Sequence, residues 1–308
     1  MYTQNANITF DKVDKTKAVV KHKRLNDLNG KEWVKATKSV WMNLNDDRSL
    51  HDIETALEVG VLLSEAPVRD NLKKNHPATF SENDIRKLIR FFTKEKEIVF
   101  DPFLGSGSSG VAALREERNF IGIELYTEWL ELAKTRINIE LNVTNPDIIV
   151  KTYCGDALAT MRSFSSESVD FIVTSPPYWG ILKKLDHKAK QERVSKKLAT
   201  NYGNDCSDLG GILEYEDFVK ALTRNFQEYY RLLKPKQYAA IIISDFRHGQ
   251  KYYMFHAHVA NAMQEVGFTL QGLISLVQDN KKLYPYGYPT TYVPNISNQF
   301  IVICRKLK

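Results

Sequence analysis

Residues 97–110 read E-I-V-F-D-P-F-L-G-S-G-S-S-G, and the class of fold can be predicted from them. The run 97–100 predicts a buried strand, and the residues after it predict a glycine turn and then a helix over 111–118. Glycines let the backbone approach a ligand closely, and a helix N-terminus offers free N–H groups. The order strand, glycine turn, helix therefore predicts an α/β fold with a ligand site at the turn. The G-x-G-x-x-G spacing alone is a weak dinucleotide signal, and no Gly-Lys-Ser/Thr follows to make a Walker A loop.

Acidic residues follow the next two predicted strands. The strand over 120–124 ends in Glu124, about twenty residues past the glycines, and the strand over 148–153 is followed by Asp156. A carboxylate at the first position can accept both hydroxyls of a ribose, and one at the second can accept from an adenine amino group. Either acid alone could be a solvated strand end. Because both fall beside the glycine turn, a nucleoside site is the favoured interpretation.

A second motif, T-S-P-P-Y-W, follows the apolar run over 169–173, which predicts a buried parallel strand. Prolines lack an N–H and have a fixed φ, so the chain must leave the sheet at Thr174. Ligands bind at the carboxyl edge of such sheets. The segment offers there the hydroxyl of Ser175, the carbonyl of Pro176 and the ring of Tyr178, which together suit a flat heterocycle carrying an amino group. The alternative is a Pro-Pro turn with a surface tyrosine.

The remaining hydrophobic patterns predict alternating helices and strands, which is typical of the α/β class. Helices are expected over 49–63 with Ser49 as N-cap, from Ser81 onward, and over 128–141, 215–233 and 255–267. Strands are expected over 238–244, 268–277 and 299–305, the last two paired antiparallel. If residues 30–41 were also helical, Trp33 and Trp41 would fall on roughly one face as packing anchors.

The composition indicates a soluble globular protein of 308 residues, with 43% hydrophobic residues and a net charge of +6. No apolar run approaches the roughly 18 residues of a membrane span, and the polar N-terminus lacks a signal-peptide core, so we expect a cytoplasmic protein. The three cysteines, Cys154, Cys206 and Cys304, have neither a paired framework nor a metal-ligand spacing, so no metal is expected. The positive charge fits a nucleic-acid partner, although many enzymes of small anions share it.

Taken together, the two motifs resemble those of the S-adenosylmethionine-dependent DNA amino-methyltransferases, which modify N4 of cytosine or N6 of adenine. The resemblance covers residues 76–305 and rests on D-P-F-L-G-S-G at Asp101–Gly107 and T-S-P-P-Y at Thr174–Tyr178. It implies a Rossmann-like class I fold, with a mostly parallel seven-stranded sheet and an antiparallel last strand. It also implies S-adenosylmethionine as cofactor and double-stranded DNA as partner. Many relatives carry the two motifs in the opposite order, so the target-recognition segment cannot be transferred by position.

The resemblance also implies roles for individual residues. The segment His76–Phe80 would close over the methionine end of the cofactor. Five residues would line the methionine pocket: Phe80, Asp101, Phe103, Gly105 and Gly107. Glu124 would hold the ribose and Asp156 the adenine. The catalytic segment around the flipped base would be formed by Ser175, Pro176, Pro177 and Tyr178.

The chain divides into an N-terminal helical and basic extension over 1–70 and a catalytic domain over 71–308. Segments 179–213 and 278–297 are candidate target-recognition insertions, because long loops in compact domains are usually functional. A basic run directly follows the base motif, where phosphate contact is favoured over a solvated loop. Its members are Lys183, Lys184, Lys188, Lys190, Arg193, Lys196 and Lys197.

The first residue of the base motif indicates the target atom. Adenine enzymes of the family mostly carry Asp or Asn there and cytosine N4 enzymes mostly Ser, so Ser175 favours N4 of cytosine, with N6 of adenine as the alternative. Carbon-5 cytosine methylation is excluded, because none of the cysteines lies in a Pro-Cys context or beside the base motif.

Three other classes of function compete with this one: an RNA base methyltransferase, a nucleotide-dependent oxidoreductase and a non-catalytic DNA-binding protein. A restriction-modification role, or modification of phage or host DNA, is expected. A cognate restriction endonuclease is a candidate partner in that setting, and the oligomeric state stays open.

The basic run yields a prediction about salt. Replacing several of its Lys and Arg residues by Gln should flatten the slope of log affinity for DNA against log salt, because each phosphate contact releases counterions. Fluorescence anisotropy of a labelled duplex across a salt series measures this slope. An unchanged slope would mean that the run is only a solvated loop.

Overall fold

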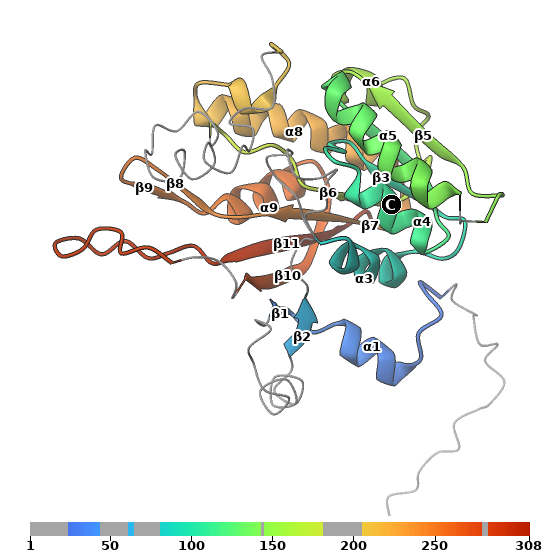
Figure 1. Cartoon of the computed structure of the whole chain (residues 1–308), viewed down its shortest axis with the longest axis horizontal. Helices are drawn as coiled ribbons and strands as arrows, with labels where there is room; N and C mark the ends of the chain where they lie inside the picture. Colours follow the sequence, from blue (N-terminus) through green and yellow to red (C-terminus); the bar gives the residue numbers. More distant parts are fainter. Residues whose placement is uncertain (1–23, 44–60, 65–80, 143–144, 181–204, 279–282) are drawn as a thin grey trace, which may run out of the picture.

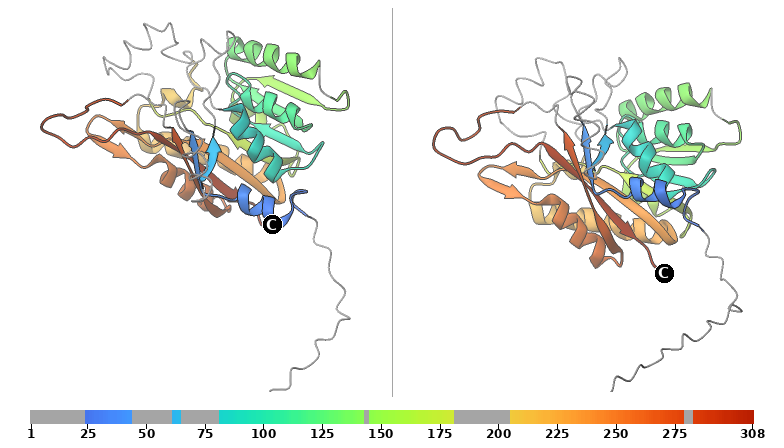
Figure 2. Two further views of the ribbon diagram at one scale, coloured as in Figure 1. Left: turned by 60° about the horizontal axis from the view of Figure 1, so that its bottom comes forward. Right: turned by 90° about the horizontal axis from the view of Figure 1, so that it is seen from below.

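The computed structural model of the chain describes residues 24–43, 61–64, 81–142, 145–180, 205–278 and 283–308. Within these ranges, nine strands form one sheet with helices on both of its faces (Figures 1 and 2). None of the described helices combines the length and the apolar character that a membrane span requires.

The expected seven-stranded sheet is present and is mostly parallel. Its strands lie in the order β5 (Val150–Cys154), β4 (Asn119–Glu124), β3 (Ile98–Asp101), β6 (Val169–Thr174), β7 (Leu233–Ile243), β11 (Asn298–Arg305) and β10 (Thr269–Gln278). From β5 to β7 neighbouring strands are parallel, whereas β11 runs antiparallel to both β7 and β10. The class I fold with an antiparallel last strand is therefore confirmed.

Two short strands from the N-terminal region extend this sheet beyond β10. Strand β1 (Val40–Asn43) pairs in parallel with β10, and β2 (Val61–Ser64) pairs in parallel with β1. The prediction of a helix ending at Leu63 is wrong for 61–63, and residues 49–60 lie outside the described ranges. Residues 61–63 pair with β1, which itself lies on the open edge of β10, and this pairing engages their backbone groups. Tertiary context therefore overrides helical periodicity here.

The two tryptophans of this region lie in different elements. Helix α1 (Gly30–Ala36) contains Trp33 and ends before β1, which contains Trp41. No single helix therefore carries both tryptophans, and the condition for placing them on one helical face is not met. Trp41 is only 2% exposed and packs into the core beside α3, as a packing anchor should, whereas Trp33 is 39% exposed.

Helices cover the two faces of the sheet in groups of three. On one face lie α3 (Glu82–Phe92), α4 (Ser108–Arg115) and α5 (Thr127–Leu141), and on the other lie α6 (Ala157–Met161), α8 (Tyr215–Leu232) and α9 (Phe255–Glu265). Because side chains alternate along a strand, Val99 faces the first group and Phe100 the second. The 3₁₀ turn η3 (Leu209–Gly211) and the hairpin of β8 (Phe246–His248) and β9 (Lys251–Tyr253) were not predicted from the sequence.

The glycine turn is shorter than predicted, because α4 begins at Ser108. Gly107 precedes it in a left-handed conformation, with φ of 80°. A Cβ at Gly107 would lie 3.0 Å from the Cα and 3.0 Å from the Cβ of Ala133 in α5. The turn therefore needs glycine both for its backbone angle and for the close approach of α5.

Gly107→Ala should lower the free energy of unfolding by about 2–5 kcal/mol, from left-handed strain and from overpacking against a backbone atom. Gly249→Ala is a matched control, because Gly249 also has positive φ, of 60°, but no atom lies within 4 Å of its added Cβ. That control should lose only about 1–2 kcal/mol. Urea titrations measure both values, and equal losses would contradict the close approach of α5.

Candidate active site

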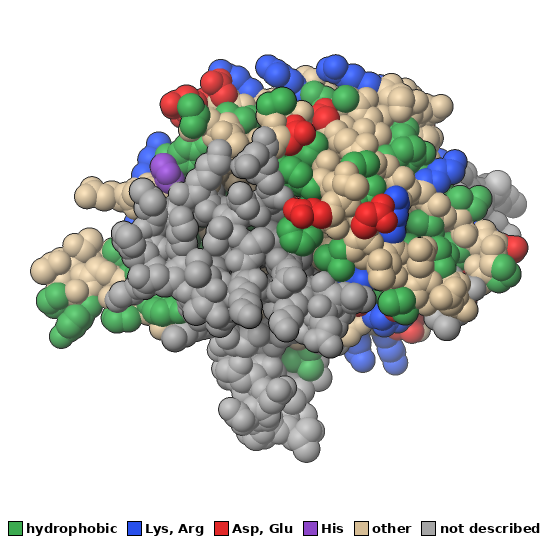
Figure 3. Space-filling model, turned by 45° about the horizontal axis from the view of Figure 1, so that its top comes forward, with side chains coloured by type: hydrophobic (Ala, Val, Ile, Leu, Met, Phe, Trp, Pro, Cys, Tyr) green, Lys and Arg blue, Asp and Glu red, His purple; other side chains and the backbone are tan. Residues whose placement is uncertain are grey.

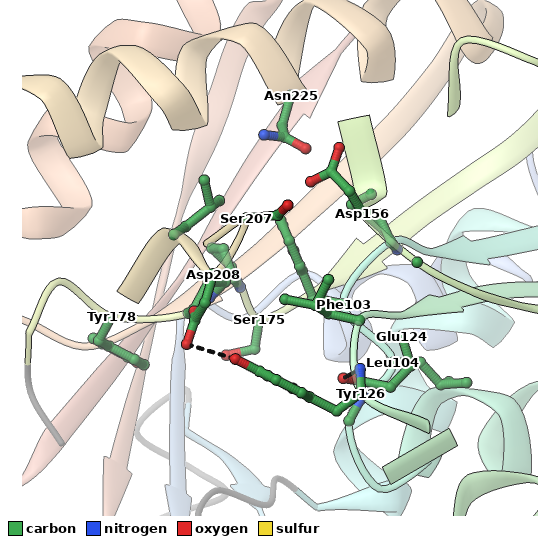
Figure 4. A pocket seen from close by; sticks show the side chains of 18 of the residues that line it. Phe103, Leu104, Glu124, Tyr126, Asp156, Ser175, Tyr178, Ser207, Asp208 and Asn225 are labelled. Atoms are coloured by element: carbon green, nitrogen blue, oxygen red, sulfur yellow. Dashed lines mark hydrogen bonds between the residues drawn. The ribbon is translucent and has the colours of Figure 1, made fainter. Parts of the chain in front are cut away.

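The carboxyl ends of four parallel strands meet at one edge of the sheet. Strands β6, β3, β4 and β5 are direct neighbours, so segments distant in the sequence converge there. A pocket opens at this edge (Figure 4). Its lining includes eight of the predicted site residues: Phe103, Gly105, Glu124, Asp156, Ser175, Pro176, Pro177 and Tyr178.

The glycine turn forms one end of the pocket. The N–H of Leu104 donates to the carbonyl of Ile123 at 2.9 Å, and Arg136 of α5 donates to the carbonyl of Ser106, so both sides of the turn are held. Ser108 starts α4, lines the pocket and is 2% exposed. Among the described residues its hydroxyl has no hydrogen-bond partner. A buried hydroxyl at a helix N-terminus fits the polar methionine end of S-adenosylmethionine.

Glu124 forms the middle of the pocket wall. Its Oε2 accepts from the N–H of Gly105 at 2.8 Å, and its Oε1 accepts from the N–H of Tyr126 at 3.0 Å. These bonds fix the carboxylate while each oxygen keeps a lone pair for a ligand. Burial raises the pKa of Glu124, although the two backbone hydrogen bonds oppose that shift. A fixed pair of acceptors at this place fits the two hydroxyls of a ribose.

Asp101 is not where the resemblance implied. It is completely buried beneath the pocket and is not one of the lining residues. Its Oδ1 accepts from the N–H of Phe103 at 3.0 Å and from the hydroxyl of Thr174 at 2.6 Å, and its Oδ2 accepts from Ser109 at 2.5 Å. Burial raises the pKa of Asp101 to about 6. Asp101 therefore positions the walls of the pocket, and Gly107, which is also absent from the lining, positions the turn.

The base motif follows β6 directly and faces the pocket from the side opposite Glu124 (Figure 4). The ring of Tyr178 is half-buried, with its centroid 5.8 Å from that of Phe255. Trp179 anchors the motif from below, because its Nε1 donates to the carbonyl of Leu213 at 3.1 Å and its ring packs against Tyr215 at 5.2 Å. An aromatic cluster therefore helps to hold the loop in place.

The lining also includes residues that were not among the predicted site residues, and those from other elements are Tyr126, Ser207, Asp208, Leu209 and Asn225. The Tyr126 hydroxyl donates to Asp208 at 3.2 Å and so joins the end of β4 to the segment that precedes α8 (Figure 4). Burial, with the neighbouring Asp208 carboxylate adding to it, raises the pKa of Tyr126 to about 12, so the hydroxyl stays protonated at neutral pH. Two signals in the sequence pointed here: Tyr126 comes just after the strand-end acid, and Ser207, Asp208 and Leu209 fall in the segment 179–213 that was expected to be functional.

Phe80 and the basic run over 183–197 lie outside the described residues, so their roles stay predictions. Figure 3 turns the top of the view in Figure 1 forward, and on this face the Lys and Arg side chains of the described residues lie mostly toward the rim.

Comparison with known proteins places the chain in a family. A family model described as "DNA methylase", for N6 and N4 methyltransferases, matches residues 1–135 and 169–308. The Type II methyltransferase M2.DpnII of Streptococcus pneumoniae is 34% identical over 116 residues, which are 34% of this chain and 43% of that protein. The Type II methyltransferase M.Cfr9I of Citrobacter freundii is 43% identical over 65 residues, or 21% of this chain and 22% of that protein.

The chain thus spans less than half the length of these curated relatives in the matched segments. A crystal structure of TTHA0409 from Thermus thermophilus, complexed with S-adenosyl-L-methionine, is 25% identical with a TM-score of 0.35, over 50% of this chain and 54% of that one. The family model, by contrast, matches all of the chain except residues 136–168. The chain therefore belongs to the N6/N4 DNA methylase family of amino-methyltransferases, whose cofactor is S-adenosylmethionine.

Proposed function

We propose that the chain methylates the exocyclic amino group of a base flipped out of double-stranded DNA, and that this group is N4 of cytosine. The observation that carries the proposal is a shared pocket, because the base motif from Ser175 opens into the cavity that Glu124 and Asp156 line. A nucleoside site alone would serve many reactions. A second set of hydrogen-bond acceptors and an aromatic ring beside it support transfer to an amino-bearing heterocycle.

The residues of the pocket fit the cofactor part by part. Glu124 would hold the ribose, Asp156 the adenine, and the turn around Gly105 with Ser108 the methionine end. S-adenosylmethionine supplies an electrophilic methyl group on a sulfonium centre when it is bound. The pocket wall then has to bring the acceptor nitrogen into line with that group.

The base motif would make the amino group a better nucleophile. The lone pair of an exocyclic amino group is delocalised into the ring, so the nitrogen attacks poorly. Acceptance of its two N–H bonds by the Ser175 hydroxyl and the Pro176 carbonyl favours a pyramidal nitrogen with its lone pair directed at the methyl group. The base must leave the duplex to reach this site, which costs a few kcal/mol. Stacking on Tyr178 offsets about 1–3 kcal/mol of that cost.

The choice of cytosine rests on the serine at position 175, where adenine enzymes of the family mostly carry Asp or Asn. A restriction-modification setting is part of the proposal, because the matched relatives are named Type II methyltransferases. A cognate restriction endonuclease would then be the partner in the cell. Contact of the basic run over 183–197 with DNA phosphates is proposed on its charge and its place after the base motif.

Glu124→Gln should weaken S-adenosylmethionine binding by about 1.5–3 kcal/mol, roughly 10- to 150-fold in Kd. The amide would turn its NH₂ toward either the N–H of Gly105 or the N–H of Tyr126, so one backbone donor loses its acceptor. The wild-type affinity should also fall toward acid pH, because protonation removes an acceptor. That fall begins above the usual range of a glutamate, since burial raises the pKa of Glu124.

Calorimetry across a pH series tests both statements. Glu128→Gln is the matched control, because Glu128 is exposed in the first turn of α5 and does not line the pocket. Unchanged affinity in the Glu124 variant would remove Glu124 from the cofactor site.

The wild-type protein should form N4-methylcytosine in DNA, and Ser175→Ala should slow its formation on the order of 10²-fold, because one oriented acceptor is lost. Cofactor affinity should stay near that of the wild type. The measurement is digestion of the product to nucleosides, followed by chromatography and mass spectrometry. Ser163→Ala, at an exposed serine after α6, is the control and should keep the wild-type rate. N6-methyladenine as the sole product would refute the cytosine assignment and leave the cofactor site untouched.

A further inference from the structure

Asn225 carries a buried acceptor that the protein itself does not satisfy. It lies on α8, is 2% exposed and lines the same pocket as Glu124. Its Nδ2 donates to the carbonyl of Ala221 at 3.0 Å, which fixes the orientation of the amide. Its Oδ1 has no hydrogen-bond partner among the described residues. Buried polar atoms are normally paired, so an acceptor held in this way at a pocket wall indicates a ligand with a donor.

The buried face of α8 makes this asparagine conspicuous. Its other large buried side chains are Phe218, Leu222, Phe226 and Leu232, together with Tyr215 and Tyr229. The one hydrogen bond that the Asn225 side chain makes joins it to a carbonyl of its own helix, four residues earlier. That carbonyl needs no side chain, because helix bonds already engage it. Packing alone would therefore be served by a leucine at this position.

Asp156 supplies a second acceptor close by. It is the N-cap of α6, and its Oδ1 accepts from the N–H of Ala159 at 2.7 Å, which fixes the carboxylate at the pocket wall. Figure 4 shows the amide oxygen of Asn225 turned toward this carboxylate. Two acceptors that face each other across a cavity suit a ligand group with two N–H bonds between them. Leu125 and Leu209 line the same pocket and offer apolar contacts to a flat ring.

We infer that Asn225 is a cofactor-specificity residue, whose Oδ1 shares the exocyclic amino group of the cofactor's adenine with the Asp156 carboxylate. This inference rests on the proposed function, because it takes the ligand of the pocket to be an adenosyl compound. The amino group has two hydrogens, and each acceptor takes one. A purine with a 6-oxo group would present an acceptor to two acceptors, so the pair selects 6-amino purines.

The test varies the ligand and the protein together. Calorimetry measures the Kd of S-adenosylhomocysteine and the Kd of its analogue that lacks the 6-amino group. The ratio of the two values is the preference for the amino group, and it is measured for the wild type, Asn225→Leu and Asn225→Ala. Each variant should bind S-adenosylhomocysteine about 3- to 10-fold more weakly, the effect of one neutral hydrogen bond. Binding of the deamino analogue should change little. The preference for the amino group should therefore fall by about the same factor. Combining the change in the protein with the change in the ligand forms a thermodynamic cycle, which isolates the interaction between Asn225 and the amino group.

The alternative is that Oδ1 holds only a water molecule. The wild type and both variants would then show the same preference, and the inference would be overturned. Failure of the wild type to bind S-adenosylhomocysteine at all would instead refute the proposed function, so the two failures are distinct. Gln227→Ala is the control, because Gln227 is exposed on α8 and lines neither this pocket nor the adjoining one that Asn225 and Asp156 share. Circular dichroism and thermal melting verify that each variant is folded, and the alanine variant serves if the leucine variant is not.

Discussion

The carboxylate of Asp101 connects three segments at the carboxyl edge of the sheet, where the pocket lies. It accepts from the turn after β3, from Ser109 at the start of α4 and from Thr174 at the end of β6. The nucleoside wall and the base motif are therefore fixed relative to one another by one buried side chain. All three donors are neutral, so burial raises the pKa of Asp101 from 3.8 to about 6. The native state then binds this proton more tightly than the unfolded state, and the free energy of unfolding falls as the pH rises through that interval.

The elements that follow a local pattern could be predicted from the sequence. Strands β3, β4 and β6 are short apolar runs closed by turn residues, and α5 and α8 have clear helical periodicity. The N-terminal region behaves differently, because β1 pairs with the edge of β10 and β2 pairs with β1, so both strands depend on segments distant in the sequence. Trp41 of β1 is buried, and no periodicity within the segment indicates it.

The site residues also fall into those that a local sequence pattern reveals and those that it does not. Glu124, Asp156 and Ser175 could be found because each ends or follows a strand, and parallel neighbours bring their carboxyl ends together. Asp101 also ends a strand, but the sequence does not say whether such a side chain faces the ligand or the core. Asn225 could not be found, because it lies in the middle of α8, and the sequence does not show that this part of the helix lines the pocket. Tyr126 and Asp208 meet across 82 residues of chain, a separation that no local pattern bridges.

The segment that carries Asp208 also contacts the end of the base motif. The N–H of Gly180 donates to the carbonyl of Gly210 at 3.3 Å, and a Cβ on Gly210 would lie 3.3 Å from the carbonyl oxygen of Tyr178. Gly180 and Gly210, which are 30 residues apart in the sequence, are therefore held side by side. Closing a loop between fixed ends depends only weakly on its length, at about 0.6 kcal/mol per doubling. The number of residues between Gly180 and Gly210 can accordingly change at a small cost in free energy, because their backbone contact fixes the two ends whatever the length between them.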